Sequence, residues 1–480
     1  MKMINEYITA TILAVVAGGT ADAQLAKPMP KLVVNITIDQ LRTDYLETFL
    51  PYYGSKGFKK LFNEGVVYDN AQYSFSPVDR ASAVASVVTG TTPYYHGITG
   101  TKWFDKSSLL SVDCVDDNRY DGIFTNEKTS PMKLLSTTVG DELKISTDGE
   151  AVVYSVAKDR DAAVLGGGHA ADGAFWVDGR NKCWCTSDFY FKKAPEWLDV
   201  YNIKNLTDID KGNVNSFITH IALECVKQGE MGKDPIPDLL TVTYDACPPH
   251  GKDKGNKRLQ ELYMQLDKEL ETLVANVEES VGRSNVLFVI TGTGYCDEKE
   301  VDTERYNIPT GTFYINRTAS LLNMYLGAIY GQDRYVEASY GNQIYLNLKQ
   351  IEMKRINMSE LQSRSQSFLI QNSGVANAYT SRDLLLSGAN TDAKLRNWYN
   401  QSRCGDLVVE ITPGWKLLNE DTKQQYVSKE SQVAFPIIVY GTGVVARRVE
   451  TPVTVDRIAP TVAKAVRIRA PNACSATTLY

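Results

Sequence analysis

Histidine is scarce in this chain, with only four in 480 residues. So few imidazoles leave little material for a histidine-rich metal centre. Asp and Glu (57) outnumber Lys and Arg (51), so the charge balance gives no sign of a nucleic-acid partner. The sequence also lacks internal repeats, low-complexity tracts and linkers rich in Pro, Gly or Ser. Its length and ordinary hydrophobic content suit one large α/β unit with insertions.

The N-terminus lacks a hydrophobic run long enough to anchor the chain permanently in a membrane. Its apolar run, Tyr7 to Val16, follows Lys2 and precedes the A-x-A pattern of Ala21-Asp22-Ala23. We therefore expect residues 1–23 to be a signal peptide, residues 24–480 to be the mature protein, and the location to be the periplasm. The apolar run is too short for a transmembrane anchor, so none is expected. No cysteine lies near the cleavage point, so a lipid anchor is not expected either.

The stretch KLVVNITIDQLRTDY begins at Lys31 and is dominated by β-branched and aliphatic residues up to Asp39. This pattern predicts a buried strand of a parallel sheet that ends in a carboxylate. Ligands of open α/β sheets bind outside the carboxyl ends of the strands. Asp39 is therefore a candidate metal ligand, although an aspartate that caps the following turn would give the same local pattern.

The remaining chain predicts an α/β fold with a mostly parallel central sheet flanked by helices. Residues 301–400 alternate short strands with amphipathic helices and predict an inserted cap. Ser130-Pro131 is typical of a helix start. The other elements predicted are helices over 58–62, from Ser82 and over 259–277, and strands over 66–75, from Ala151, over 239–244, from Asn285 and from Phe435.

Several motifs occur in order between residue 31 and about residue 470: IDQLRTDY, GFKKLFNEGVVYDNAQY, TGTTPYYHGITG, VGDELK, SVAKDRDAAVLGGGHAADGAFW and RCGDLVVEITPGW. As an ordered set they resemble the alkaline phosphatase superfamily. The resemblance is to its bacterial phosphate-monoesterase branch, which is related to type I phosphodiesterases and nucleotide pyrophosphatases. It implies an alkaline-phosphatase-like domain over residues 24–480.

In this superfamily two zinc ions, held by Asp and His, activate a hydroxyl nucleophile at a helix start. The resemblance places the first metal-bridging aspartate on Asp39 and the nucleophile on Arg80. A guanidinium stays protonated and cannot attack phosphorus, so no residue is assigned as catalytic. Ser82 lies two residues further on and would need a changed backbone to serve.

The resemblance also places substrate-holding residues. The position of an amide that helps to hold substrate falls on Thr101, and the lysine and arginine that grip phosphate oxygens fall on Lys158 and Arg160. The last two keep the residue types of the family. They are therefore expected to face an anion, although solvated charges at a strand end would have the same sequence.

The metal motifs are degenerate. Asp245 is kept, but its histidine partner, His250, falls one residue late, and Thr293 and Gly294 stand where an Asp-His pair is expected. The last ligand position falls within residues 432–434, which contain no histidine. The resemblance gives His96 and His169 structural roles, and His220 reads as a core histidine on an apolar helical face.

Only Asp39, Asp245 and His250 then remain as relic or residual ligands, too few for a two-zinc site. No cofactor is expected. We hypothesise that Arg80 replaces the lost metal charge through a bidentate ion pair with Asp39.

Cys247 and Cys296 lie on the two degenerate metal loops. They could form a disulfide, could join His250 in a new thiolate zinc site, or could be two unrelated thiols. The eight cysteines of an exported chain allow too many pairings for the sequence to choose among them.

The favoured function is an exported pseudophosphatase that binds a phosphate-like anion or an envelope protein partner. Its cleft would be lined by Arg80, Lys158 and Arg160. The alternative is an active, divergent phosphoric ester hydrolase. It would use a single metal at Asp39, Asp245 and His250, or a zinc site that includes cysteine. A third possibility is a structural subunit of an envelope complex, in which the cleft is merely filled.

Overall fold

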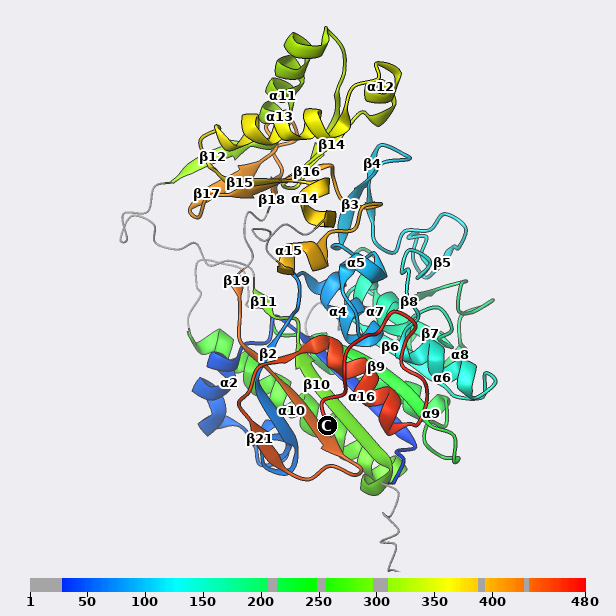
Figure 1. Ribbon diagram of the computed structural model, residues 1–480. Coiled ribbons are helices and arrows are strands. Elements are labelled where there is room, and N and C mark those ends of the chain that lie inside the picture. Colours follow the sequence, from blue (N-terminus) through cyan, green and yellow to red (C-terminus); the bar gives the residue numbers. More distant parts are fainter. Residues whose placement is uncertain (1–27, 206–213, 248–255, 297–309, 387–392, 427–430) are drawn as a thin grey trace, which may run out of the picture.

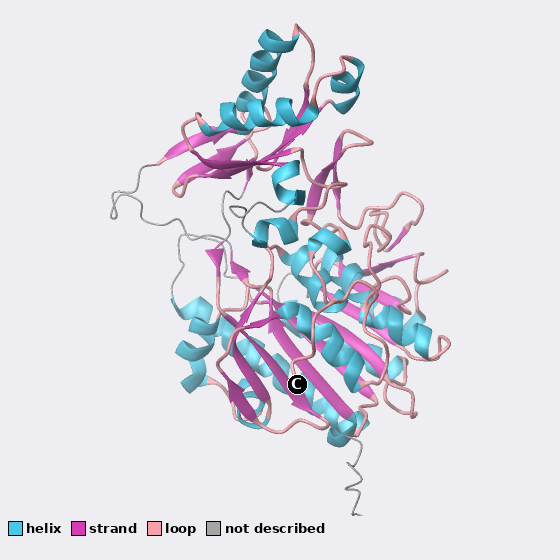
Figure 2. Ribbon diagram, in the orientation of Figure 1, coloured by secondary structure: helices cyan, strands magenta, loops and turns pink. Residues whose placement is uncertain are grey.

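The computed structural model describes residues 28–205, 214–247, 256–296, 310–386, 393–426 and 431–480 (Figure 1). The predicted signal peptide and His250 lie outside these ranges. The chain forms a large sheet with helices on both faces, and a smaller cap layer lies above one end of it (Figures 1 and 2). Within the described residues, no helix combines the length and the apolar character needed to cross a membrane.

The central sheet has the strand order β21-β2-β20-β10-β1-β9-β6-β7-β8-β5. Its middle is parallel from β10 through β7, whereas β20 and β8 join it antiparallel. The predicted α/β class with a mostly parallel sheet is therefore confirmed. The bounds are β1 Leu32–Asp39, β2 Val66–Gln72, β5 Gly122–Ile123, β6 Val153–Ala157, β7 Gly173–Val177, β8 Trp184–Ser187, β9 Asp238–Asp245, β10 Val286–Gly292, β20 Phe435–Gly441 and β21 Arg447–Val449, with β22 Val453–Thr454 beside β2.

Helices bury their apolar sides against both faces of this sheet. One face packs against α2, α3, α8, α9 and α10, and the other against α4, α6, α7 and α16. All eight residues of β1 are buried, which explains why most of its residues are apolar. The bounds are α2 Thr43–Phe49, α3 Phe58–Glu64, α4 Arg80–Thr89, α6 Val139–Ser146, α7 Arg160–Gly167, α8 Glu196–Asn205, α9 Val214–Gln228, α10 Asn256–Val281 and α16 Ile458–Ala465.

The cap has its own sheets and its own apolar core. A four-stranded sheet of order β13-β14-β16-β15 and a three-stranded sheet of order β12-β17-β18 carry α11, α12 and α13. Three cap strands lie beyond residue 400, so the cap extends past the predicted insertion. The bounds are β12 Gly311–Tyr314, α11 Ile315–Tyr330, β13 Val336–Tyr340, β14 Gln343–Leu346, α12 Leu348–Met353, α13 Met358–Ile370, β15 Val375–Thr380, β16 Leu407–Ile411, β17 Trp415–Leu418 and β18 Gln425–Tyr426.

Short elements connect the core and the cap. The hairpin of β3 and β4 lies near the junction, as do α5, α14 and α15 (Figure 1), and β11 pairs with β19. Their bounds are β3 Lys102–Asp105, β4 Leu110–Asp113, α5 Pro93–His96, α14 Ser381–Leu386, α15 Ala393–Trp398, β11 Tyr295–Cys296 and β19 Ser431–Gln432.

Two local predictions are wrong. Ser130-Pro131 does not open a helix. Instead Thr138 caps α6, and the side-chain Oδ1 of Asn472 accepts bonds from the Ser136 hydroxyl and the Thr137 backbone N–H. His220 is exposed on α9 rather than buried, because the neighbouring Phe217, Ile218 and Ile221 occupy the inner side of the helix.

The sheet gathers the functional candidates at one edge. Asp39 pairs with Asp245 in register at the carboxyl ends of β1 and β9. Lys158 follows β6 and Thr293 follows β10, so both lie at the same edge. This is the position that parallel α/β sheets use for ligands.

Candidate functional site

Arg80 is the first residue of α4, and the preceding residues fix its position. The Asp79 side chain caps the helix by accepting a bond from the Ser82 backbone N–H at 2.9 Å. The buried Ser82 hydroxyl accepts the Asp79 backbone N–H at 3.0 Å, which completes the capping box, and it also donates to Asp79 Oδ1 at 2.7 Å. Ser82 is therefore committed to the cap and does not replace the missing nucleophile.

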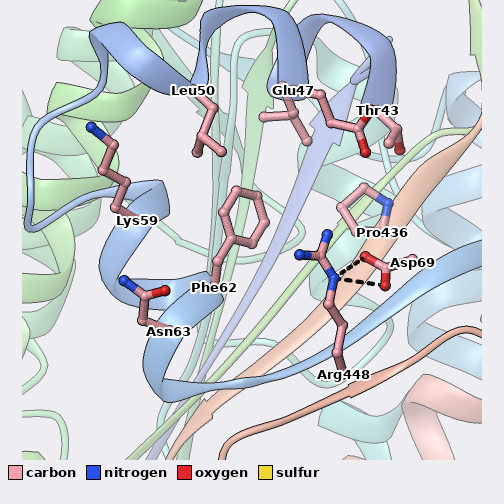
Figure 3. Close-up of a pocket in the computed structure, with 10 residues that line it drawn as sticks. Thr43, Glu47, Leu50, Lys59, Phe62, Asn63, Asp69, Pro436 and Arg448 are labelled. Atoms are coloured by element: carbon pink, nitrogen blue, oxygen red, sulfur yellow. Dashed lines mark hydrogen bonds and ion pairs between the residues drawn. The ribbon is translucent and has the colours of Figure 1, made fainter.

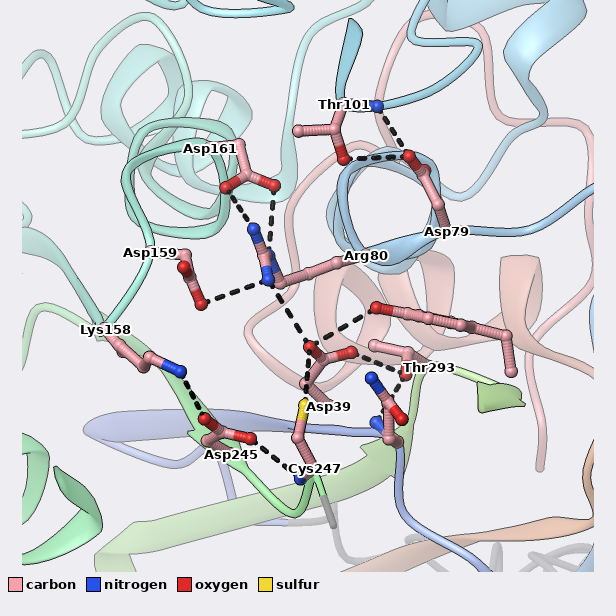
Figure 4. A network of polar contacts seen from close by, with 12 residues as sticks. Asp39, Asp79, Arg80, Thr101, Lys158, Asp159, Asp161, Asp245, Cys247 and Thr293 are labelled. Atoms are coloured by element: carbon pink, nitrogen blue, oxygen red, sulfur yellow. Dashed lines mark hydrogen bonds and ion pairs between the residues drawn. The ribbon is translucent and has the colours of Figure 1, made fainter. Parts of the chain in front are cut away.

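The Arg80 guanidinium is surrounded by three aspartates (Figure 4). Its Nε and Nη2 donate to the two oxygens of Asp161 at 3.1 and 2.9 Å. Its Nη1 lies 3.1 Å from Asp159 Oδ2 and 3.6 Å from Asp39 Oδ2. The contact with Asp39 is present, but the hypothesis of a bidentate pair with Asp39 is wrong. The bidentate partner is Asp161, because α4 packs against α7, which carries it.

Asp39 is 3% exposed and accepts several bonds. The Thr293 hydroxyl donates to Oδ1 at 2.9 Å, and the Tyr295 hydroxyl and Cys247 thiol approach Oδ2 at 3.4 and 3.8 Å. Burial raises the pKa of Asp39 to about 7. The positive charge of Arg80 opposes that rise, and the negative charge of Asp245 adds to it.

Asp245 has a different partner. Lys158 Nζ donates to its Oδ2 at 2.6 Å, and the Cys247 backbone N–H donates to Oδ1 at 2.8 Å. Burial disfavours the charged form of Asp245, but Lys158 and Cys247 outweigh it and hold the pKa below its usual value. Lys158 thus neutralises the second relic metal ligand, as Arg80 does the first.

Four carboxylates share two cations in this Asp39 cluster, which we define as Asp39, Arg80, Lys158, Asp159, Asp161 and Asp245. With all six groups ionised, the cluster carries an excess of negative charge. No role was predicted for Asp159 and Asp161. The alternating charges of AKDRDA are the sequence feature that could have indicated their part in this cluster.

The other two predicted anion-binding residues turn elsewhere. Arg160 Nη2 lies 2.7 Å from Asp116 Oδ1, and its Nη1 donates to Thr129 at 3.0 Å. Thr101 donates its backbone N–H and its hydroxyl to Asp79, at 2.5 and 2.8 Å (Figure 4). Thr101 therefore supports the cap of α4, and Arg160 belongs to a separate acidic group.

The residues described do not fit the two zinc ions of the superfamily. Over those parts of the chain, no group of three or more His, Cys, Asp or Glu side chains is arranged to hold a metal ion. Asp39 already forms an ion pair with Arg80, Asp245 accepts a bond from Lys158, and Thr293 donates a hydroxyl where a ligand is expected. The proposed third ligand, His250, lies outside the described residues.

The cysteine alternatives can be compared directly, since all eight cysteines lie in described parts of the chain. None forms a disulfide, so Cys247 and Cys296 are not joined. Cys247 Sγ faces Asp39, whereas Cys296 Sγ lies 3.9 Å from Arg42 Nη1. Burial and the negative charges of Asp39 and Asp245 raise the pKa of Cys247, which favours the neutral thiol over a zinc-binding thiolate.

His96 and His169 make contacts that suit the structural roles expected of them. His96 is fully buried, its Nε2 lies 3.0 Å from Ser86 Oγ, and its Nδ1 accepts the Ile98 N–H at 3.1 Å. Burial lowers its pKa to about 3, so it is neutral at physiological pH. His169 lies between Asp141 and the Leu134 carbonyl, both at 3.0 Å.

A separate cavity of about 320 Å³ lies between α2, α3 and strands β2 and β20 (Figure 3). Apolar side chains from Leu46, Leu50, Phe62 and Pro436 form much of its wall. Arg448 binds Asp69 across it at 2.8 Å. None of its lining residues belongs to the Asp39 cluster, so this cavity does not supply the missing chemistry.

Comparisons with known proteins agree with this architecture. Residues 33–434 match the family model described as type I phosphodiesterase / nucleotide pyrophosphatase. Alkaline phosphatase PafA of Elizabethkingia meningoseptica is 26% identical over 93% of each chain, and alkaline phosphatase PhoV of Synechococcus elongatus is 26% identical over 92% of this chain and 91% of its own. The crystal structure of wild-type PafA superposes with a TM-score of 0.81 and 24% identity, covering 95% of this chain and 99% of that one. The chain therefore belongs to the type I phosphodiesterase / nucleotide pyrophosphatase family of the alkaline phosphatase superfamily.

Proposed function

We propose that this protein is an exported pseudophosphatase, a family member that binds a ligand or partner in the periplasm without hydrolysing phosphate esters. The observation that carries the proposal is the place of Arg80. It occupies the nucleophile position, and its guanidinium forms ion pairs with Asp161, Asp159 and Asp39. A permanently charged donor at this position supplies no attacking group.

The surrounding residues support the same conclusion. The nearby hydroxyl of Ser82 is bound within the helix cap. Both relic ligands face a cation of the chain itself, since Arg80 contacts Asp39 and Lys158 binds Asp245. Removing either cation would leave a buried carboxylate without its partner, so each relic ligand is already paired with a cation of the chain.

The charge excess also bears on what the cleft binds. A phosphate-like anion there would meet four carboxylates, and it would have to draw Arg80 or Lys158 away from its partner. We therefore favour recognition at another surface of the protein, by an anion or by an envelope protein partner.

The proposal is tested by hydrolysis of p-nitrophenyl phosphate and bis-p-nitrophenyl phosphate in the presence of added zinc. The matched control is Asp39→Asn, which removes the buried carboxylate with little change of shape. We expect the wild-type and variant proteins to give the same background rate. Turnover by the wild-type protein that the variant loses would overturn the proposal.

One observation favours a second candidate, an active phosphoric ester hydrolase with a rebuilt metal site. The negative excess of the Asp39 cluster, with Cys247 Sγ 3.8 Å from Asp39, would suit one divalent cation held by Asp39, Asp245 and His250. This candidate requires turnover that a chelator abolishes and that one metal restores. The pseudophosphatase proposal requires that no metal give turnover.

A further inference from the structure

Two cations lie against one buried indole where the core meets the cap. Trp103, on β3, is 2% exposed. The Arg403 guanidinium carbon lies 4.9 Å from its ring centroid, and Lys133 Nζ lies 5.6 Å from it. Arg403 comes from the turn between α15 and β16, which leads into the cap, whereas Lys133 precedes α6 in the core. Three segments distant in sequence thus meet at this point.

Among the described residues, neither Lys133 nor Arg403 forms an ion pair with a carboxylate, and Asp116 and Asp105 act on them only at longer range. Lys133 Nζ donates to the Asp113 carbonyl at 2.6 Å, and Arg403 Nη2 makes a long bond of 3.5 Å to the Lys133 carbonyl. Arg403 Nε and Trp103 Nε1 are buried without a hydrogen-bond partner. This differs sharply from Arg80 and Arg160, whose guanidinium groups are each held by carboxylates.

Carboxylates therefore act on these two cations only from beyond ion-pair distance. Burial lowers the pKa of Arg403, and Asp105 opposes that shift. Burial also lowers the pKa of Lys133, which Asp116 opposes and Arg403 reinforces. The Ser107 hydroxyl and the Ser108 N–H occupy Oδ2 of Asp105. Two half-buried cations without a directly paired carboxylate gain from an anion that binds between them.

We propose that Lys133 and Arg403 form a binding site for an oxyanion of phosphate type, either free or carried by a larger ligand. A guanidinium offers a planar pair of donors that matches two oxygens of such a group, and the lysine adds a point charge. Stacking on Trp103 orients the guanidinium. Both side chains keep part of their surface exposed, so a ligand can reach them from solvent.

This site is separate from the Asp39 cluster. It gives the proposed binding role a class of ligand, and the biological meaning of the site rests on that proposed function. Because Arg403 is on the cap side of the junction and Lys133 on the core side, a bound oxyanion would link the two. Binding is measured separately from hydrolysis. Absence of anion binding would therefore leave the pseudophosphatase proposal intact, and detection of hydrolysis would leave the anion site intact.

The test is calorimetric titration of the full chain with inorganic phosphate and with phenyl phosphate, accompanied by tryptophan fluorescence. We expect saturable binding that weakens about tenfold or more in Arg403→Gln and in Lys133→Met, because each removes a charge-assisted bond. The matched control, Arg119→Gln, alters an exposed arginine paired with Asp117 and should bind like the wild-type protein. Preference between the two ligands then identifies a free or an esterified phosphate as the source.

Trp103→Phe supplies a second readout, since it should retain binding of the anion but lose the fluorescence change. Thermal unfolding in the absence of ligand checks that each variant is folded. The proposal is overturned if the wild-type protein binds neither anion, or if folded Arg403→Gln binds as tightly as wild type.

Discussion

Replacing Arg80 with methionine should destabilise the protein at pH 8 far more than a surface substitution does. Methionine retains much of the aliphatic length but supplies no charge. Asp161 and Asp39, whose side chains are 8% and 4% exposed, would then lose their shared cation. In the wild-type protein Asp39 is mostly ionised at pH 8, because its pKa is about 7 and Arg80 holds that pKa down. The variant would therefore bury Asp161 without its partner, and Asp39 would either remain charged and unpaired or take up a proton.

The expected size follows from the loss of one partner of a buried ion pair, which costs about 3–5 kcal/mol. Unfolding entropy is about 2.1 cal/mol/K per residue, so a chain of 480 residues has an unfolding entropy of about 1 kcal/mol/K. Arg80→Met should therefore lower Tm by about 3–5 °C. The effect is larger than that of an exposed pair because water does not screen these carboxylates.

Differential scanning calorimetry at pH 8 measures this shift. The control is Arg119→Met, whose parent side chain is 64% exposed and pairs with Asp117 at 2.7 Å, and its shift should be much smaller. Adding Asp161→Asn to Arg80→Met should recover part of the loss, since it removes one of the stranded charges. An Arg80→Met shift no larger than that of Arg119→Met would refute the reasoning.

Three further predictions concern the surroundings of the site. Buried His96 resists protonation, whereas in the unfolded chain it takes up a proton below about pH 6.5. This group should therefore lower the wild-type free energy of unfolding by about 1.4 kcal/mol for each pH unit between pH 6.5 and pH 3. Urea unfolding of His96→Gln should show a smaller loss of this free energy over the same pH range. Asp79→Ala should cost about 1–2 kcal/mol by uncapping α4, while Asp79→Asn, which can still cap, should cost less; equal losses would contradict the capping role. Gly441 has φ +120°, and a Cβ there would lie 2.1 Å from the Val286 carbonyl, so Gly441→Ala should lower Tm well beyond Gly149→Ala, which has φ +86° and open space around it.

The sheet could be predicted because its strands carry signals that do not depend on distant residues. Leu32–Asp39 is mostly apolar and buried throughout, and the parallel order then brings Asp39 beside Asp245 without further information. Local signals failed where tertiary contacts compete with them. No helix starts at Ser130-Pro131, and the chain just beyond it is held by the Asn472 side chain, which accepts the Thr137 backbone N–H. A helical apolar pattern could not show which side of α9 carries His220.

Within the site, the sequence identified the residues but not the directions of their side chains. Arg80 and Asp39 are in contact as anticipated, yet Asp161 takes the bidentate bond because α7 presents it to α4. Lys158 and Arg160 are two residues apart and were expected to act together. In the structure, Lys158 turns to Asp245 and Arg160 to Asp116. Such choices depend on partners contributed by other segments, which spacing alone does not reveal.

Metal analysis of the purified protein is the most direct test of whether cations of the chain have taken the place of zinc. The protein would be equilibrated with a small excess of zinc, passed over a desalting column and measured by mass spectrometry, with Asp39→Asn as the matched control. If cations of the chain replace zinc, we expect far less than one zinc per chain and the same zinc content in both proteins. One or two zinc ions per wild-type chain, lost in Asp39→Asn, would contradict it.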